Sequence, residues 1–319
     1  MVTHEEGVVK TKIPRRTIAV AVMAMLVSTL FLVSTVTSEM VMQTVFINPD
    51  GSVYPSSVPI QRSGNTYFFT GDAYACLIVN KSDIVIDGAG YTLRGALNGT
   101  PADVWIGQGP NPEISNETTV SYTIGIDTAS RNIRGLTIKN LNIRDFSIGM
   151  YIWTTNNTIT GNAVVNNIVG VLLSGSNNDI VGNYIVDNEM GMFFGTNEPG
   201  SVPLNLTVSR NSFNNNTDHL GGCVCKEYNM TEETHTWDNG KEGNYWDDYN
   251  GTDANGDGIG DTPYVIDVLN MDRYPLIQSH VAPPTVAAKV PVETVAVAAV
   301  LAAIVIVSVV AVRKRRKKA

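Results

Sequence analysis

The sequence has few charged residues and no excess of basic ones. Charged residues make up 16% of the 319 residues, below the usual share of about a quarter. Lys and Arg number 22 against 30 Asp and Glu, so the formal net charge is −8. Apolar residues reach 43%, enough for a core, which excludes a disordered acidic tail. Because nucleic-acid binders normally carry a basic excess, we expect no nucleic-acid partner.

Cysteine and signatures of catalysis are also scarce. The three cysteines are too few for a disulfide framework, and the chain has no nucleophile elbow, zinc signature or phosphate loop. Asparagine is plentiful, and glycosylation sequons recur along the chain. They fit an exported, glycosylated surface, although a chain rich in Asn and Thr also produces such triplets by chance. The sequons begin at Asn80, Asn98, Asn116, Asn156, Asn205, Asn215, Asn229 and Asn250.

Two long uncharged runs lie near the ends of the sequence. Residues 17–36 follow a basic stretch, which is the pattern of an export signal within residues 1–38. Cleavage after Ser38 and an uncleaved signal anchor both remain open. Residues 294–312 are long enough to cross a membrane as a helix, and the basic tail 313–319 follows at once. The positive-inside rule places that tail in the cytoplasm, so we expect a cell-membrane protein, single-pass or two-pass, with an extracellular main domain.

A repeat of 21 residues occupies the middle of the chain. Three blocks align without gaps, TIKNLNIRDFSIGMYIWT from Thr137, TITGNAVVNNIVGVLLSG from Thr158 and DIVGNYIVDNEMGMFFGT from Asp179. A fourth block starts at Thr207, 28 residues later, and a loop at 197–203 accounts for the extra seven residues. Apolar residues recur in the same columns of each block. So do a glycine column (Gly149, Gly170, Gly191) and an asparagine column (Asn162, Asn183, Asn211).

Short strands at a period of about 21 predict an all-β fold, a parallel β-helix in which each repeat forms one coil. The asparagine column predicts hydrogen-bonded ladders at the corners, and the glycine column predicts positive φ or close backbone approach. We expect the β-helix over 39–217 and a capping segment with an Asp-rich loop over 218–277. A stalk linker would then occupy 278–293, before the transmembrane helix.

The stretch from Gly243 to Leu276, GNYWDDYNGTDANGDGIGDTPYVID…DRYPL, together with IDGAGYTLRG and the Asn/Gly-rich coils, resembles the NosD-type β-helix proteins. These are abundant in archaea as exported surface proteins. The resemblance covers about residues 45–277 and implies a right-handed parallel β-helix of the carbohydrate-binding and sugar-hydrolase type. The namesake is a periplasmic accessory protein for copper-site maturation in nitrous oxide reductase and works with a separate transporter, whereas this chain carries its own C-terminal anchor.

Two groups of residues are candidate metal ligands. In DANGDGIGD, oxygen ligands at alternating positions suit Ca²⁺ in a structural role, although the bidentate Glu of an EF-hand is absent. An acidic loop without metal is the alternative. The second group offers imidazoles and thiols, which suit copper, but the Cys-Val-Cys stretch is also compatible with a plain surface loop. The calcium set is Asp253, Asn255, Asp257, Ile259 and Asp261; the copper set is His219, Cys223, Cys225 and His235, with Met230 nearby.

Catalytic and sugar-binding residues are less well marked. Asp145 and Asp187 share a column two coils apart, about the separation of the carboxylates in inverting hydrolases. They are weak catalytic candidates, since Asn166 and Asn215 continue the column and no arginine or histidine is expected beside them. Exposed aromatic side chains in the coils are candidates for stacking on sugar rings, namely Tyr151, Trp153 and Tyr184.

Three functions are compatible with these observations. The favoured one is an anchored cell-surface β-helix protein that binds a glycan or a surface-layer partner without catalysis. The alternatives are a polysaccharide hydrolase or lyase and a copper-site maturation protein. Between residues 17 and 288 the sequence has 11 basic and 27 acidic residues. Because such a domain attracts cations and repels anionic polymers, a neutral glycan or a cation-bridged partner is expected.

Overall fold

A computed structural model describes residues 42–97, 123–128, 133–195, 203–222 and 234–279. Apart from Met42, these residues belong to the second of two compact units, Gln43–Ala319. Every regular element in this part of the chain is a β-strand. The described residues include no helix that is long and apolar enough to cross a membrane. The apolar runs 17–36 and 294–312 lie outside the described residues.

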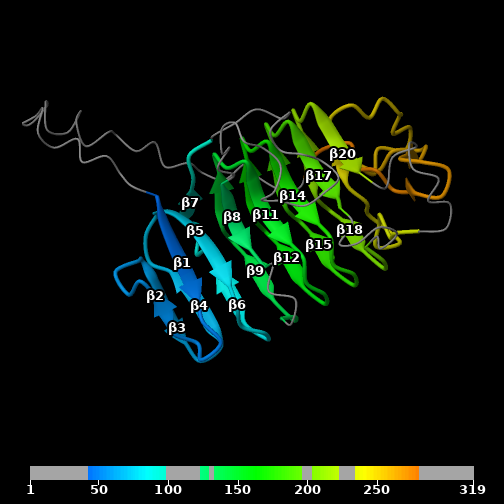
Figure 1. The fold of residues 1–319 in the computed structure, drawn as a ribbon. Helices are drawn as coiled ribbons and strands as arrows, with labels where there is room; N and C mark the ends of the chain where they lie inside the picture. Colours follow the sequence, from blue (N-terminus) through cyan, green and yellow to red (C-terminus); the bar gives the residue numbers. More distant parts are fainter. Residues whose placement is uncertain (1–41, 98–122, 129–132, 196–202, 223–233, 280–319) are drawn as a thin grey trace, which may run out of the picture. The chain divides into compact units, whose positions relative to one another are not determined.

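The strands form three arms, each made of parallel strands from successive coils (Figure 1). The arm of long strands consists of β1 (Gln43–Ile47), β5 (Ala73–Val79), β8 (Ile124–Asp127), β11 (Ile148–Ile152), β14 (Val169–Leu173), β17 (Met190–Phe194) and β20 (Asp218–Gly222). A second arm consists of β7 (Thr92–Arg94), β10 (Asn142–Arg144), β13 (Ala163–Val165), β16 (Tyr184–Val186), β19 (Ser212–Asn214) and β21 (Tyr245–Trp246). These two arms join through β5, which pairs with both β7 and β8.

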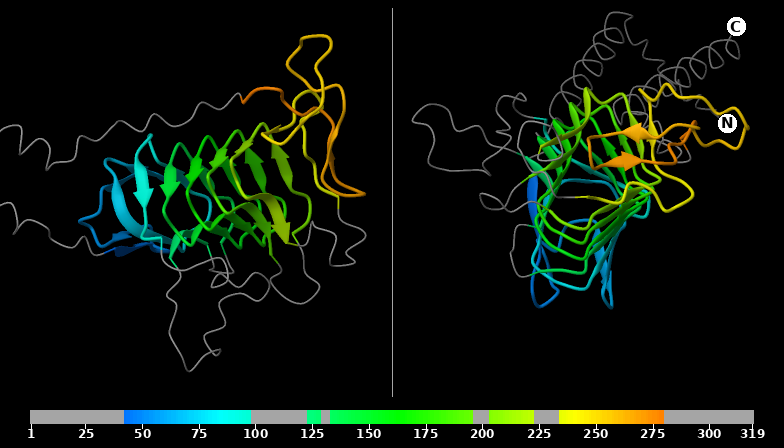
Figure 2. Two further views of the ribbon diagram at one scale, coloured as in Figure 1. Left: turned by 90° about the horizontal axis from the view of Figure 1, so that it is seen from above. Right: turned by 90° about the vertical axis from the view of Figure 1, so that its right-hand side faces the viewer.

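The third arm is a separate seven-stranded sheet. It consists of β3 (Ile60–Ser63), β4 (Thr66–Phe69), β6 (Val85–Asp87), β9 (Thr137–Lys139), β12 (Thr158–Thr160), β15 (Asp179–Val181) and β18 (Thr207–Ser209). The hairpin β3–β4 is antiparallel, and so is the contact of β1 with β2 (Val53–Tyr54). A complete coil passes through the third, second and long-strand arms in turn, as in β9, β10 and β11. Figure 2 shows the same stack of coils from two further sides.

The predicted register is confirmed strand by strand. Thr158 pairs with Thr137 and with Asp179, which are 21 residues away on either side. Asp179 pairs with Thr207 across the predicted spacing of 28. The loop that was expected to absorb the extra residues lies almost wholly outside the described residues. The apolar columns point into the interior of the coils, where side chains of successive coils pack on one another. One such column, Ile138, Ile159, Ile180 and Val208, is fully buried.

Buried asparagines form three ladders along the coils. In the ladder predicted from the sequence, Asn162 donates its amide hydrogens to Asn183, which donates to Asn211, at 3.0–3.1 Å. Asn211 donates in turn to Asn244, and the backbone N–H of Asn244 donates to Asp272. Two further ladders join Asn167, Asn188 and Asn216, and Asn157 with Asn178. Because a buried amide without partners is costly, each ladder fixes the stacking of one corner.

The residue before each ladder asparagine except Asn244 adopts a left-handed conformation, and before Asn211 this residue is Arg210. Asn166 and Asp187 have φ of 54° and 55°, and Gly161 and Gly182 have φ of 64° and 69°. Asn, Asp and Gly are the residues that tolerate this conformation best, which explains their recurrence at the corners. The glycine column differs from these corners, since Gly149, Gly170 and Gly191 have no positive φ.

The glycine column reflects close approach of backbones instead. A Cβ on Gly170 would lie 2.5 Å from the carbonyl oxygen of Gly191, and one on Gly149 would lie 2.6 Å from the carbonyl oxygen of Gly170. No side chain fits at these distances. Of the two alternatives predicted for this column, close approach is therefore correct and positive φ is wrong.

The coils continue beyond the boundary expected at residue 217. Strand β20 pairs with β17, and β21 pairs with β19, so both extend the arms into the segment 218–277. The predicted division at 217 therefore falls inside a coil. Trp246 of β21 stacks between Phe213 and Tyr264, with ring centroids 4.5 and 4.4 Å away. The hairpin of β22 (Tyr264–Val265) and β23 (Met271–Asp272) supplies Tyr264 and closes this end.

Candidate functional site

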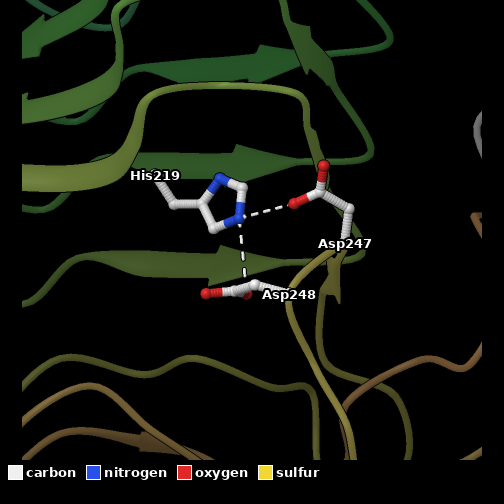
Figure 3. Close-up of side chains that lie close together, drawn as sticks. All are labelled: His219, Asp247 and Asp248. Carbon is white, nitrogen blue, oxygen red and sulfur yellow. Dashed lines mark ion pairs between the residues drawn. The ribbon is translucent and has the colours of Figure 1, made fainter.

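A histidine and two aspartates converge at the C-terminal end of the coils (Figure 3). His219 lies on β20, and Asp247 and Asp248 directly follow β21. Nε2 of His219 is 2.8 Å from Oδ1 of Asp247 and 3.3 Å from Oδ1 of Asp248. We call these three residues the His219 cluster. Among the described residues, they are the group whose ligand atoms lie close enough together to hold a metal ion.

Neighbouring groups hold both carboxylates in place. The second oxygen of Asp247 accepts the backbone N–H of Asn215, which is in the adjacent coil. The second oxygen of Asp248 accepts the hydroxyl hydrogen of Tyr264 at 3.1 Å. Burial and the neighbouring Asp248 raise the pKa of Tyr264, so this hydroxyl keeps its proton and remains a donor. Each carboxylate thus has one oxygen fixed and one directed at His219.

The asparagine ladder also orients the imidazole. Oδ1 of Asn216 accepts from Asn188, so the Asn216 amide nitrogen is the atom 3.5 Å from Nδ1 of His219. In the neutral imidazole, a donor facing Nδ1 favours the tautomer whose proton is on Nε2, between the aspartates. A metal ion would replace this proton, and the contact with Asn216 would have to loosen as the proton moves to Nδ1.

The His219 side chain is largely shielded, whereas the aspartates are open to solvent. Its side chain is 9% exposed, compared with 29% for Asp247 and 58% for Asp248. Phe213 and Trp246 lie beside the imidazole, with ring centroids 6.0 and 5.9 Å away. The cluster therefore has an apolar floor and an acidic opening, an arrangement that admits a cation from solvent and restricts the motion of the imidazole.

Residues 38–251 match the family model for the periplasmic copper-binding protein NosD. The chain belongs to the NosD family. This family has the right-handed parallel β-helix fold and is extracytoplasmic, in agreement with the stacked coils. No curated protein and no solved structure matches the chain. The match ends at Gly251, so most of the closing segment that resembled NosD-type proteins lies beyond it.

The copper ligands predicted for this NosD-family chain do not form one group in its described part. His235 packs its ring against Phe194, with centroids 5.7 Å apart, and its backbone N–H donates to Asn270. Burial lowers the pKa of His235 and keeps the ring neutral. Cys223, Cys225 and Met230 lie outside the described residues. Of the predicted set, only His219 belongs to the His219 cluster.

The donors of the His219 cluster fit some oxidation states of copper better than others. One imidazole nitrogen and two carboxylate oxygens suit cupric copper, zinc and other divalent ions, whereas cuprous copper prefers sulfur. The donor set of these three residues is therefore compatible with a cupric ion. Their carboxylates were absent from the predicted copper set, because the cluster depends on how the last coil closes.

The predicted calcium loop folds around its own backbone. Asp253 accepts backbone N–H groups from Gly256, Asp257 and Gly258 at 2.8–3.1 Å. Asp261 accepts from the N–H of Ala254 and the hydroxyl of Thr252. Gly258 has φ of 87°, as expected for a sharp turn at this position. Asn255 and Ile259 join the same network through Asp257. Calcium binding by this loop stays a prediction.

The weak catalytic candidates occupy corners. Asp145 and Asp187 have φ of 63° and 55°. Asp145 is 6% exposed and receives Nε of Arg94 at 2.8 Å, Nε of Arg144 at 3.2 Å and the amide of Asn166. The expectation that no arginine lies beside this column is therefore wrong. Arg144 is the residue before Asp145 and could have been expected beside it, whereas Arg94 is 51 residues away in sequence and comes from a coil interrupted by a long insertion.

The aromatic candidates do not form one platform. Tyr151 is 5% exposed and packs with Ile148 and Phe193, so the expectation of an exposed ring is wrong for this residue. Trp153 contacts Tyr151 edge to face at 5.4 Å and is partly buried. Tyr184 lies on β16 in the second arm, whereas Tyr151 lies on β11 in the long-strand arm. A sugar could therefore not stack on all three rings at once.

Proposed function

We propose that this chain is an extracytoplasmic, membrane-anchored β-helix protein that binds a divalent metal ion at the His219 cluster and a glycan at its surface, without catalysis. The observation that carries the metal part is the convergence of Nε2 of His219 with one oxygen each of Asp247 and Asp248. The other oxygens are held by Asn215 and Tyr264. Such outer contacts orient metal ligands and strengthen binding.

Copper in the cupric state and zinc are the ions that suit these donors best. The printed family description, periplasmic copper-binding protein, supports copper. Three protein ligands leave coordination positions open for a partner or for water, so the cluster would supply a docking point for a cation-bridged ligand. Calcium is the alternative ion for the separate loop at 253–261, where all the candidate side-chain ligands are oxygens.

Titration of the full chain in detergent with CuSO₄, ZnCl₂ and CaCl₂, followed by calorimetry, tests the metal site. We expect wild type to bind one Cu²⁺ or Zn²⁺. Asp248→Asn and His219→Gln should each bind the same ion about tenfold more weakly. Asp218→Asn, an exposed neighbour of His219 on the same strand, serves as the control. The double variant Cys223→Ala/Cys225→Ala should still bind one Cu²⁺ or Zn²⁺ per chain. Unchanged affinity in Asp248→Asn and His219→Gln would rule the cluster out.

The absence of catalysis is proposed from the surroundings of Asp145. A general acid or base must reach its substrate, but this carboxylate is buried and already accepts from two guanidinium groups and an amide. Asp187 accepts from Asn215 through one oxygen. Both residues fit corner positions of the coils better than a pair of hydrolytic carboxylates.

Membrane attachment through residues 294–312 and glycosylation are further parts of this proposal. The uncharged run and the basic tail after it support an extracellular main domain. Among the sequons in the described residues, those at Asn156, Asn205, Asn215 and Asn250 present exposed asparagines. The first three lie at left-handed corners of the coils.

A further inference from the structure

Two arginines stand side by side on the outer face of the second arm. Arg94 of β7 and Arg144 of β10 are direct register partners, so their backbones are about 4.8 Å apart. Each uses only Nε to contact the same oxygen of Asp145, at 2.8 and 3.2 Å. The terminal guanidinium nitrogens make no hydrogen bond within the described part of the chain. The side chains are 61% and 31% exposed, so these nitrogens are accessible from solvent.

The charges in this pair are not balanced. Like charges directly opposite each other on neighbouring strands destabilise a sheet. Asp145 offsets one positive charge of the two, and its other oxygen is occupied by Asn166 at 2.7 Å. Among Arg94, Arg144 and Asp145 alone, one positive charge therefore remains, in a domain that is otherwise strongly acidic. Asp145 sits at a left-handed corner and is buried, and one of its oxygens contacts Nε of both guanidinium groups.

The neighbours in the same outward column suit a sugar ring. Tyr74 of β5 is the register partner of Arg94, and its side chain alternates with the buried Ala73 and Ala75 to face outward. Val165, the partner of Arg144 on the other side, is also partly exposed. The column thus places an aromatic ring, two guanidinium groups and an aliphatic side chain in succession along the stack.

From this placement we infer that Tyr74, Arg94 and Arg144 form a binding site for a carboxylated sugar of an acidic glycan. The paired terminal nitrogens of a guanidinium match the two oxygens of a carboxylate, while the Tyr74 ring offers a face for the sugar. The site rests on the proposed glycan-binding function and names its ligand class. It differs from the expectation of a neutral glycan or a cation-bridged partner, which was drawn from the total charge of the domain.

Calorimetry on the full chain in detergent at low salt tests the site with hexagalacturonate and cellohexaose as probes. We expect wild type to prefer hexagalacturonate, and Arg94→Gln and Arg144→Gln each to weaken its binding by about tenfold. Arg94→Lys keeps the charge but lacks the forked donors, and it should also bind more weakly. The control is Arg210→Gln, whose guanidinium contacts Glu242 at another corner. Circular dichroism checks that each variant keeps its fold.

The outcomes separate the site from the wider function. Equal affinity for the two sugars, or unchanged affinity in Arg94→Gln and Arg144→Gln, would overturn the site while leaving glycan binding intact. Binding of neither sugar would overturn both. Release of reducing ends from hexagalacturonate would contradict the non-catalytic role. Competition by sodium sulfate as strong as by galacturonate monomer would show a general anion site and contradict the sugar assignment.

Discussion

Single residues at the corners of the coils combine structural and chemical roles. Asp145 completes a left-handed corner and also orients two arginines, and Asn216 ends a ladder while it orients the His219 imidazole. In both cases the backbone position is fixed first by the repeat, and the side chain then holds a charged neighbour. At these corners the repeat sets the backbone, and the residue type decides which neighbour the side chain can hold.

Asp272 is the residue whose ionisation should influence stability most directly. Its side chain is buried, and its carboxylate accepts from the N–H of Asn244, the indole N–H of Trp246 and the N–H of Tyr274. Burial nevertheless outweighs these hydrogen bonds and raises the pKa of Asp272 from 3.8 to about 6. Between these values the folded chain binds more protons than the unfolded chain, so this group lowers stability as pH rises.

We therefore expect the contribution of Asp272 to the free energy of unfolding to fall by at most about 3 kcal/mol between about pH 4 and pH 6. The measurement is the melting temperature of wild type and Asp272→Asn across that range, with Glu189→Gln as an exposed control. Asp272→Asn should flatten the dependence, whereas Glu189→Gln should not. The lowered pKa values of Asp87 and Asp238 act in the opposite direction, below about pH 4. An identical pH profile for Asp272→Asn and wild type would contradict the assignment.

At the scale of one element, the strands of the long-strand arm are spaced by backbone contact rather than by side chains. The glycine column lies where the carbonyl oxygen of each coil faces the Cα of the coil before it. This makes the column sensitive to one added carbon atom, since close-packed interiors accommodate extra volume poorly.

Gly170→Ala tests this spacing. Its Cβ would lie 2.5 Å from the carbonyl oxygen of Gly191, so adjacent coils would have to separate locally. We expect a loss of about 1–3 kcal/mol in the free energy of unfolding, measured by urea titration. Gly71→Ala is the matched control, because its Cβ would meet Pro59 at an ordinary 3.4 Å. Equal losses in the two variants would show that backbone approach does not limit this column.

The elements also show how far the sequence alone leads. The repeat predicts the register of β9 to β18 because each coil must bury the same apolar columns. It does not reveal the His219 cluster, since Asp247 and Asp248 lie beyond a change of spacing. A signal was present, however: GNYWDDY from Gly243 aligns with RNSFNNN from Arg210, and Asn244 continues the ladder of Asn211. That alignment would have placed Asp247 beside Asn214 in the last coil.

Across the whole described stack, each coil contacts only the coils before and after it. The stability of such solenoids is close to the sum of the intrinsic stability of each coil and the interaction energy between neighbouring coils. The end coils have one neighbour each, so unfolding begins there. The C-terminal end is closed by Trp246, which is 1% exposed, stacks between Phe213 and Tyr264, and donates its indole N–H to Asp272 at 3.0 Å. The same end carries the His219 cluster, so the proposed metal binding would depend on this end staying closed.

Trp246→Ala should destabilise this end by about 3–5 kcal/mol, because it removes a buried ring and leaves the Asp272 carboxylate short of a donor. Hydrogen exchange measured by mass spectrometry should then rise first in β19 and β20 and decrease toward β8 and β5, since each coil transmits the loss only to its neighbour. Trp153→Ala, which removes a partly buried ring from a coil in the middle of the stack, should not produce this gradient. A uniform rise in exchange from β5 to β20 would mean that the coils unfold as one cooperative unit, and would contradict the neighbour-by-neighbour account.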